Sequence, residues 1–234
     1  MTAVREDFAE ILRLVRPGSR VLDVGCGGGE LLELLTREKG ADAQGLELSP
    51  ENVSACLARG LAVVQGDGDR DLDHFPTWAF DYAILSKTLQ QMRDPRHALS
   101  ELLRIAEQAV VSVPNFGHWK MRLYLLGRGR MPETKALPDP WWSTPNIHLC
   151  TLRDFIDLAD DLGLRIDACA ALSNGKPARA MDPKGVLENW RAETGLFLLS
   201  RRAEPQPEAT PRNLFGEVEL PKAEGPKRTR KARK

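Results

Sequence analysis

The chain has 234 residues, a formal net charge of zero, 42% hydrophobic residues and 28% charged residues. This length allows one sizeable core. Because no apolar run approaches the roughly 18 residues of a membrane helix and the N-terminus lacks an apolar block, we expect neither a membrane span nor a secretory signal. The cysteines are scattered without a C-x-x-C pair, which argues against a disulfide scaffold or a cysteine-based zinc site and favours the reducing cytoplasm. They are Cys26, Cys56, Cys150 and Cys169.

The charge is unevenly distributed between the body of the chain and its end. From Ala203 onward there are eight Lys/Arg and five Asp/Glu, so the end carries +3 and residues 1–202 carry −3. A mildly acidic body gives no reason to expect a specific nucleic-acid surface. The proline-rich end has few large apolar residues to bury, so we expect a folded domain over 1–202 and a disordered basic tail over 203–234. A solubilising role for the tail is favoured over a polyanion-binding arm.

Short strand-like runs alternate with amphipathic helical stripes along the body. The predicted strands are Arg20–Val24, Ala43–Leu46, Leu61–Val64, Phe80–Leu85, Ala109–Val113, Leu164–Leu172 and Leu196–Arg201. Helices are predicted before the first strand, after the glycines that follow it, and at three starts, Ser49-Pro50, Asp94-Pro95 and the capping box Thr151-x-x-Asp154. The alternation predicts an α/β fold, a mostly parallel seven-stranded sheet with helices on both faces. The interval Gly127–Cys150 breaks the rhythm and predicts an insertion near the ligand side, outside the sheet.

The most informative stretch is Asp23-Val24-Gly25-Cys26-Gly27-Gly28-Gly29, where a strand runs through glycines into a helix. Gly25 permits a sharp turn, Gly27 lets a ligand approach the backbone, and Gly29 allows tight packing at the helix start. Glu47 follows Gly25 by 22 residues, at the predicted end of the second strand. A carboxylate there can accept hydrogen bonds from both hydroxyls of a ribose, so the spacing predicts an adenosine-containing ligand.

The residues after the glycines distinguish between nucleotides. A dinucleotide loop usually has a third glycine where this chain has Glu30, whose charge would oppose a pyrophosphate, so NAD is disfavoured. No Lys-Ser/Thr follows, which excludes a P-loop. S-adenosylmethionine has no phosphate and carries a sulfonium cation, so acidic residues are tolerated beside it.

The segment Asp23–Gly29 resembles the first motif of class I methyltransferases, and Gln65-Gly66-Asp67 resembles a later one. This resemblance implies a Rossmann-like fold, Glu47 on the ribose and Asp67 on the adenine amino group. The cofactor-binding residues that we expect are Asp23, Gly25, Cys26, Gly27, Gly29, Glu47, Leu48, Gly66, Asp67, Gly68 and Ser86.

The second half of the chain is similar to the MetW family of methionine-biosynthesis proteins. The similarity lies in Leu85–Gln90, Pro114–Trp119, Gly129–Pro132 and Pro145–Thr151, and extends over about residues 17–200. It implies a protein that binds S-adenosylmethionine or S-adenosylhomocysteine and supports homoserine O-acetyltransferase in methionine synthesis. The alternative is an active S-adenosylmethionine-dependent methyltransferase acting on an unidentified small molecule.

Few residues after the fifth strand carry acid–base chemistry. His118 follows that strand at the ligand edge and is our candidate catalytic residue, whereas structural hydrogen bonding is favoured for at least one of His118 and His148. The two histidines do not form a metal constellation, and no metal site is predicted. Trp141-Trp142 can form an acceptor pocket, a partner surface or an apolar lid. Many small-molecule methyltransferases carry a histidine where this chain has Gln90-Gln91, which weakens the case for base-assisted methyl transfer.

Overall fold

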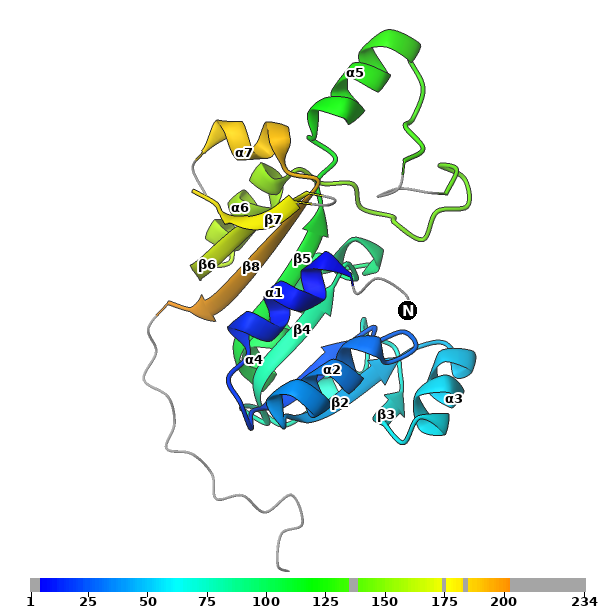
Figure 1. The fold of residues 1–234 in the computed structure, drawn as a ribbon, viewed down its shortest axis with the longest axis vertical. Coiled ribbons are helices and arrows are strands. Elements are labelled where there is room, and N and C mark those ends of the chain that lie inside the picture. Colours follow the sequence, from blue (N-terminus) through cyan, green and yellow to red (C-terminus); the bar gives the residue numbers. More distant parts are fainter. Residues whose placement is uncertain (1–4, 135–138, 174–175, 183–184, 203–234) are drawn as a thin grey trace, which may run out of the picture. The chain divides into compact units, whose positions relative to one another are not determined.

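The computed structural model describes residues 5–134, 139–173, 176–182 and 185–202. The chain divides into two units, Met1–Arg202 and Ala203–Lys234, and every described element belongs to the first (Figure 1). The predicted basic tail, 203–234, lies outside the described residues.

One eight-stranded sheet forms the centre of the described part, in the order β3-β2-β1-β4-β5-β8-β6-β7. The pairings among β3, β2, β1, β4 and β5 are parallel, whereas those of β8 with β5 and β6, and of β6 with β7, are antiparallel. The strands are β1 (Arg20–Val24), β2 (Asp42–Glu47), β3 (Ala62–Gln65), β4 (Phe80–Ser86), β5 (Ala106–Pro114), β6 (Leu164–Ser173), β7 (Lys176–Ala180) and β8 (Thr194–Arg201).

The helices begin where the sequence places their capping residues. Ser49 and Asp94 accept the N–H of the residue three positions on, and Thr151 and Asp154 form a reciprocal capping box, so these three predicted starts are confirmed. The α-helices are α1 (Glu6–Leu14), α2 (Glu30–Lys39), α3 (Pro50–Ala58), α4 (Pro95–Ile105), α5 (Trp119–Arg128), α6 (Leu152–Asp161) and α7 (Val186–Arg191), with 3-10 helices η1 (Leu72–His74) and η2 (Leu89–Gln91). Among the described residues, no helix has the length and apolar character that crossing a bilayer requires.

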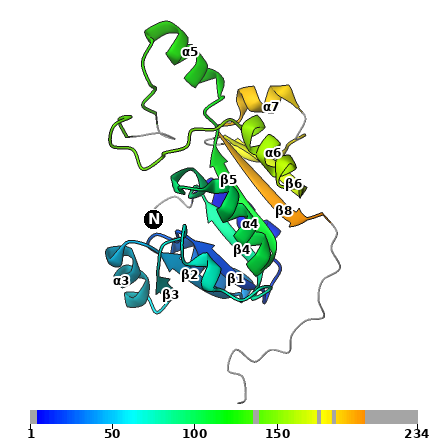
Figure 2. The ribbon, with the colours of Figure 1, turned by 180° about the vertical axis from the view of Figure 1, so that it is seen from behind.

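Helices cover both faces of the sheet, and the strand residues alternate between two cores. Leu22 and Val24 of β1 pack with α4 and α6, whereas Val21 packs with α1 and α2. The same alternation runs through β4, where Ala83 and Leu85 join the first core and Tyr82 and Ile84 the second. Figure 1 shows α1 and α2 on the near face, and Figure 2 shows α4 and α6 from behind. Two-sided burial explains why these strands read as continuous apolar runs.

The strand order reverses between β1 and β4. From β1 the chain winds outward through β2 to β3, and from β4 it winds the other way to β5. In open α/β sheets, ligands bind outside the carboxyl ends of the strands at such a reversal. The glycine loop after β1 and the segment after β4 therefore lie at the position that the topology favours for a ligand.

The sheet contains eight strands among the described residues instead of the seven predicted, because β7 was missed. It pairs with β6 alone, across a register shift between Ala171 and Ser173. An edge strand has one partner and is not buried on both sides, so its sequence, Lys-Pro-Ala-Arg-Ala, lacks an apolar run. Helices α5 and α7 were not predicted either. The interval Gly127–Cys150 lies outside the sheet, as predicted, but the excursion starts earlier, with α5 after β5.

Candidate functional site

The glycine loop joins β1 to α2 at the carboxyl edge of the sheet. The N–H of Gly25 donates to the Leu46 carbonyl at 2.7 Å, which ties the start of the loop to β2. Gly27 and Gly29 both have positive φ, at 56° and 80°. A Cβ added to Gly29 would lie 2.5 Å from Leu61, whereas one added to Gly27 would meet nothing within 4 Å. Gly29 is therefore needed for packing, as predicted, and Gly27 turns an open side of the backbone outward.

Glu47 lies at the end of β2 with its carboxylate turned toward the glycine loop. One oxygen accepts the Gly27 N–H at 2.8 Å, and the other accepts the Ser49 N–H at 2.9 Å and the Asn52 side-chain amide at 3.3 Å. The side chain is buried among these donors. Three hydrogen bonds fix the carboxylate against the backbone of the glycine loop, which fits a pre-positioned acceptor for ligand hydroxyls.

The turn after β3 forms the neighbouring wall. The Gly66 N–H donates to the Glu47 carbonyl at 2.9 Å, and a side chain at Gly66 or Gly68 would collide with Leu46 or Met92. One oxygen of Asp67 accepts the N–H of Asp69 at 2.9 Å within its own turn. Leu48, which follows β2 and precedes α3 in the chain, is 65% exposed. An exposed apolar side chain beside the Glu47 carboxylate is suited to cover the flat face of a base.

Asp23 is a buried acid near the end of β1, just before the glycine loop. Its Oδ1 has no hydrogen-bond partner among the described residues. Burial raises its pKa to about 7, an effect that Arg5 opposes and that the carboxylates of Asp7 and Glu47 reinforce. A buried carboxyl group without a partner is costly unless it stays neutral or meets a cation. This position therefore favours a ligand that brings positive charge.

A polar network from the N-terminal helix contacts the carboxyl end of β4, and it was not predicted from the sequence. Asp7 is buried in α1 and pairs with Arg5 at 2.7 Å. It also accepts hydrogen bonds from Ser86 at 2.8 Å and from Ser112 at 3.3 Å. Burial alone would raise the pKa of Asp7, but the Arg5 guanidinium, the Lys87 charge and the Ser86 hydrogen bond together outweigh it and leave the pKa below its ordinary value. Asp7 stands next to the apolar stripe of α1, a position that could have identified it as buried.

The backbone after β4 is held in an unusual conformation. Lys87 has a φ of 59°, which residues other than glycine rarely adopt. Its N–H donates to the Ser112 carbonyl and hydroxyl oxygens, and its carbonyl accepts the Gln90 amide at 2.6 Å. Backbone strain of this kind persists where neighbours enforce it, and it is concentrated at functional sites. Nothing in the sequence of Leu85–Gln90 predicted this backbone conformation.

The two histidines singled out in the sequence both make hydrogen bonds to backbone. His118 is buried and caps α5, with its Nδ1 accepting the Lys120 N–H at 3.4 Å, and it also bonds to the Arg191 backbone. Burial lowers its pKa, partly offset by Glu193. The His148 ring lies 3.3 Å from the Arg93 carbonyl. His118 also lines a cavity between α5, β7 and α7. Because its Nδ1 is engaged by the Lys120 N–H, a role of that nitrogen in acid–base chemistry requires the capping bond to break.

The paired tryptophans of the insertion face solvent. Trp141 and Trp142 are each 70% exposed, with their rings 5.9 Å apart and nearly perpendicular. Such exposure does not fit an apolar lid packed over a cofactor in this structure. It leaves the partner-surface and acceptor-pocket interpretations open.

Cys26 packs as a small apolar residue. Its sulfur fills the space beside Gly45, and burial raises the pKa of its thiol. A protonated, buried thiol is not a nucleophile. Cys26 therefore offers the site its backbone only.

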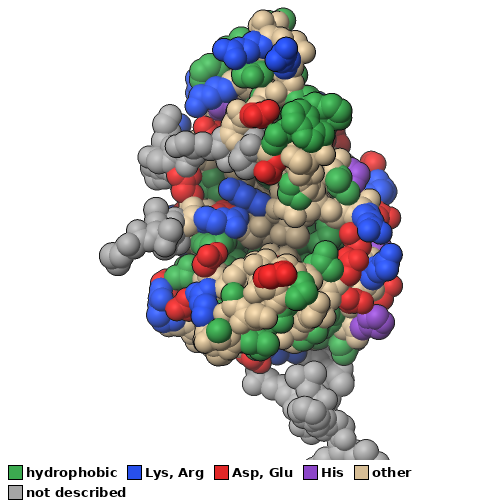
Figure 3. Space-filling view, turned by 90° about the vertical axis from the view of Figure 1, so that its right-hand side faces the viewer, with side chains coloured by type: hydrophobic (Ala, Val, Ile, Leu, Met, Phe, Trp, Pro, Cys, Tyr) green, Lys and Arg blue, Asp and Glu red, His purple; other side chains and the backbone are tan. Residues whose placement is uncertain are grey.

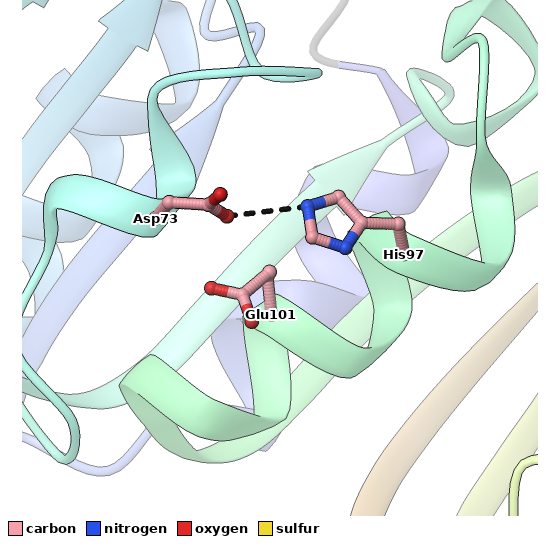
Figure 4. Close-up of side chains that lie close together, drawn as sticks. All are labelled: Asp73, His97 and Glu101. Atoms are coloured by element: carbon pink, nitrogen blue, oxygen red, sulfur yellow. Dashed lines mark hydrogen bonds and ion pairs between the residues drawn. The ribbon is translucent and has the colours of Figure 1, made fainter.

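One exposed cluster has metal-ligating side chains but lies in a surface ion-pair network. Asp73 of η1 and His97 and Glu101 of α4 gather within reach of one ion (Figure 4). The His97 ring bonds to Asp73 at 3.2 Å, while Glu101 is held by the Arg104 guanidinium at 2.7 Å. The basic partner already neutralises Glu101, and nothing else at the cluster indicates a bound cation.

Comparisons with known proteins agree with this geometry. The sequence profile of a family described as "Methionine biosynthesis protein MetW" matches residues 5–199. A bifunctional methionine biosynthesis protein MetXA/MetW of Rhodopirellula baltica is 35% identical over 170 residues, which is 69% of this chain and 27% of that protein. A ubiquinone biosynthesis O-methyltransferase of Xanthomonas oryzae pv. oryzae is 36% identical over 110 residues, 45% of each chain. The chain thus matches about a quarter of the first relative's length and under half of the second's.

A solved structure shares the fold. A Thermotoga maritima protein described as a SAM-dependent methyltransferase, possibly a histamine N-methyltransferase, superposes with a TM-score of 0.61 at 16% identity, covering 85% of this chain and 90% of that one. At this identity the likeness shows the fold alone, which is the Rossmann-like fold of class I methyltransferases.

Proposed function

The chain belongs to the MetW family of methionine biosynthesis proteins, and from that membership we propose that it binds S-adenosylmethionine or S-adenosylhomocysteine and supports homoserine O-acetyltransferase in methionine synthesis. The observation that carries the cofactor assignment is the Glu47 carboxylate, which accepts the Gly27 N–H of the glycine loop at 2.8 Å.

The residues of this edge fit S-adenosylmethionine better than a dinucleotide. Glu47 would hold the ribose, Asp67 and the exposed Leu48 would hold the adenine, and the backbone of Gly25–Gly29 would line the approach. The unpartnered Asp23 oxygen would meet the cationic, amino-acid end of the ligand. Glu30 is the first residue of α2 and is exposed. A pyrophosphate at that helix start would face its negative charge, which S-adenosylmethionine avoids.

The rest of the site would position the ligand without reacting with it. Ser86 and the Arg5–Asp7 pair close the end of β4 and keep a charged network beside Asp23. A binding role needs only these fixed contacts. The free cysteines at the described positions are consistent with the cytoplasm as the compartment that we propose.

Support for the partner comes from the bifunctional relative, whose name joins MetXA to MetW in one protein. Two activities that occur fused in one chain are good candidates for association as separate chains. We therefore propose homoserine O-acetyltransferase as the partner and S-adenosylmethionine as the ligand that reports on methionine supply.

An active methyltransferase is the second candidate, favoured by the likeness to a ubiquinone O-methyltransferase over 110 residues of the chain. When bound, S-adenosylmethionine supplies an electrophilic methyl group that an acceptor attacks in line. In such enzymes the rate comes largely from orienting the acceptor and excluding water. Here His118 is engaged as a helix cap and Gln90 bonds to the Lys87 carbonyl, so neither is poised to remove a proton.

One paired experiment separates the two candidates. The acetylation of homoserine by the purified acetyltransferase is measured with and without this chain, and with S-adenosylmethionine added. The proposed function predicts a change in rate that depends on the chain, and no labelled methyl group transferred to cell-extract components. Transfer of label without any effect on acetylation would establish the methyltransferase instead.

A further inference from the structure

Helix α5 carries apolar side chains on two faces, and the domain covers only one of them. Met121 is buried and Leu125 is half-buried, so this face points to the domain. Trp119, Leu123 and Leu126 follow each other at i, i+4 and i+7 and share the opposite face. All three are exposed, Leu126 by 84%. We call these three residues the α5 ridge.

The ridge is not needed to hold α5 on the domain. His118 caps the start of the helix, the Arg122 Nε donates to the Gly117 carbonyl at 2.6 Å, and Lys120 pairs with Glu193 at 3.6 Å. These contacts all lie in the first turns. A helix of 10 residues with one buried side chain is marginal by itself, and Figures 1 and 2 both show it projecting beyond the end of β5. Contact with another molecule would bury the ridge and stabilise the helix.

Every charged side chain on α5 itself is basic. Lys120, Arg122 and Arg128 lie on α5, Arg130 follows it, and no Asp or Glu occurs from residue 116 to residue 132. Two guanidinium groups are held over aromatic rings, Arg122 over Trp190 and Arg128 over Tyr124. Figure 3 shows basic side chains gathered at the tip of the molecule, around α5, with hydrophobic side chains among and below them.

These features define the surface that would fit the helix. Apolar anchors at i, i+4 and i+7 suit a hydrophobic groove that accepts one face of a helix, and fixed arginines suit carboxylates on its rim. A second copy of this chain is disfavoured, because a two-fold contact through α5 would bring the same basic residues together.

We propose that the α5 ridge docks into an apolar groove rimmed by acidic side chains on the partner protein. The identity of that partner rests on the proposed function, which makes it homoserine O-acetyltransferase. The ridge is a contact surface that lies on a different element from the glycine loop, so its loss leaves cofactor binding unchanged.

The test uses the full chain and the purified acetyltransferase from the same organism, with affinity measured at low and moderate salt. Leu126→Glu removes the most exposed apolar anchor and places a carboxylate against the acidic rim, so we expect at least a tenfold loss of affinity. Leu57→Glu, at a leucine of α3 that is 58% exposed, is the matched control and binds normally. Added salt weakens the unaltered complex, because the rim contacts are charged.

Each other result is decisive. Equal binding by Leu126→Glu and the unaltered chain would remove the ridge from the interface while the partnership stands. No binding by the unaltered chain would overturn both the partnership and the docking site, although cofactor binding is tested separately. If Leu126→Glu instead abolishes self-association or binding to phosphatidylglycerol vesicles, the occupant is a second copy or a membrane, and the proposal is wrong.

Discussion

Glu47 connects the glycine loop, the end of β2 and the start of α3 through a single carboxylate. Its spacing from Gly25 predicted a position at the end of the second strand, and the structure places it there, in contact with the glycine loop. Its bonds to Gly27 and Ser49 could not be predicted, because they depend on where the loop backbone turns.

The first prediction is that Glu47→Ala weakens S-adenosylmethionine binding by about tenfold or more, since hydrogen bonds to a charged acceptor are worth roughly 1.5–3 kcal/mol each. Isothermal titration calorimetry measures the affinity. Asp42→Ala, which removes an exposed acid from the other end of β2, is the control and retains full affinity. A folded Glu47→Ala protein with unchanged affinity would contradict the ribose assignment.

Gly27 and Gly40 form a matched pair at the two ends of α2. Their φ angles are 56° and 58°, and a Cβ at either position meets nothing within 4 Å. Gly27→Ala and Gly40→Ala should therefore cost similar stability, about 1–2 kcal/mol for a left-handed backbone. Only Gly27→Ala should lose cofactor affinity, by at least tenfold, because its methyl group enters the approach to the loop. Equal affinities in the two variants would show that the loop is not the cofactor cradle.

Asp23 makes cofactor binding depend on pH. Its pKa is raised to about 7 by burial, so below pH 7 the folded protein holds the proton and the carboxyl group is neutral. A cationic ligand favours the ionised form, and S-adenosylmethionine affinity should therefore rise with pH up to about 7 and then level. Calorimetry across pH 5.5–8 tests this, with Asp23→Asn as the control in which only the ligand's own titration remains. Identical pH profiles would rule out Asp23 as the titrating group.

The same shift affects the ligand-free protein. Because the pKa of Asp23 in the folded protein lies above that of an ordinary aspartate, this group stabilises the fold at low pH, and the stabilisation is lost as the pH rises through about 7. As the pH rises, Tm should therefore fall less in the Asp23→Asn variant than in the unaltered chain.

At the scale of elements, the sequence predicted strands from their short apolar runs, the edge strand β3 included, and helices from an inward apolar stripe or a capping residue. The strand Arg20–Val24 and the box Thr151-x-x-Asp154 are clear examples. The elements that were missed lack these signals: β7 is an edge strand without an apolar run, and α5 has its apolar residues split between two faces. A helix with one buried residue shows no single inward stripe.

Helix α1 is linked to the sheet by a contact that no local pattern reveals, since Asp7 and Ser86 are 79 residues apart. Asp7→Ala leaves Ser86, Ser112 and Arg5 without their acceptor and should lower the free energy of unfolding by about 1–3 kcal/mol. Chemical denaturation measures this loss. Glu10→Ala on the same helix breaks only the surface pair with Arg13 and should cost less than about 1 kcal/mol. Equal costs would mean that the buried network contributes no more than a surface pair.

At the scale of the whole molecule, the fold class could be predicted from the sequence, whereas the surroundings of His118 could not. Parallel strands with buried runs leave few topologies, and the glycine loop then marks one edge of the sheet. The place of His118 was harder to predict: it follows β5 as expected, yet its ring caps α5 and lines a cavity on the β7 side. That outcome depends on two elements with no sequence signal.

The composition of residues 203–234 predicts that they contribute nothing to the domain. A chain ending at Arg202 should retain its cofactor affinity and its thermal midpoint, because the removed segment has few large apolar residues. Differential scanning calorimetry and titration check the two quantities. A clear drop in the midpoint would show that Leu214, Phe215 or Val218 docks onto the domain.

Direct titration of S-adenosylmethionine and of NAD into the intact, purified chain tests the central claim, that the edge formed by the glycine loop and Glu47 is a cofactor site for S-adenosylmethionine. We predict saturable binding of S-adenosylmethionine with one site per chain, and none of NAD at the same concentrations, because Glu30 opposes a pyrophosphate and Asp23 favours a cation. Saturable binding of NAD, or the absence of any binding of S-adenosylmethionine by the folded chain, would contradict the account.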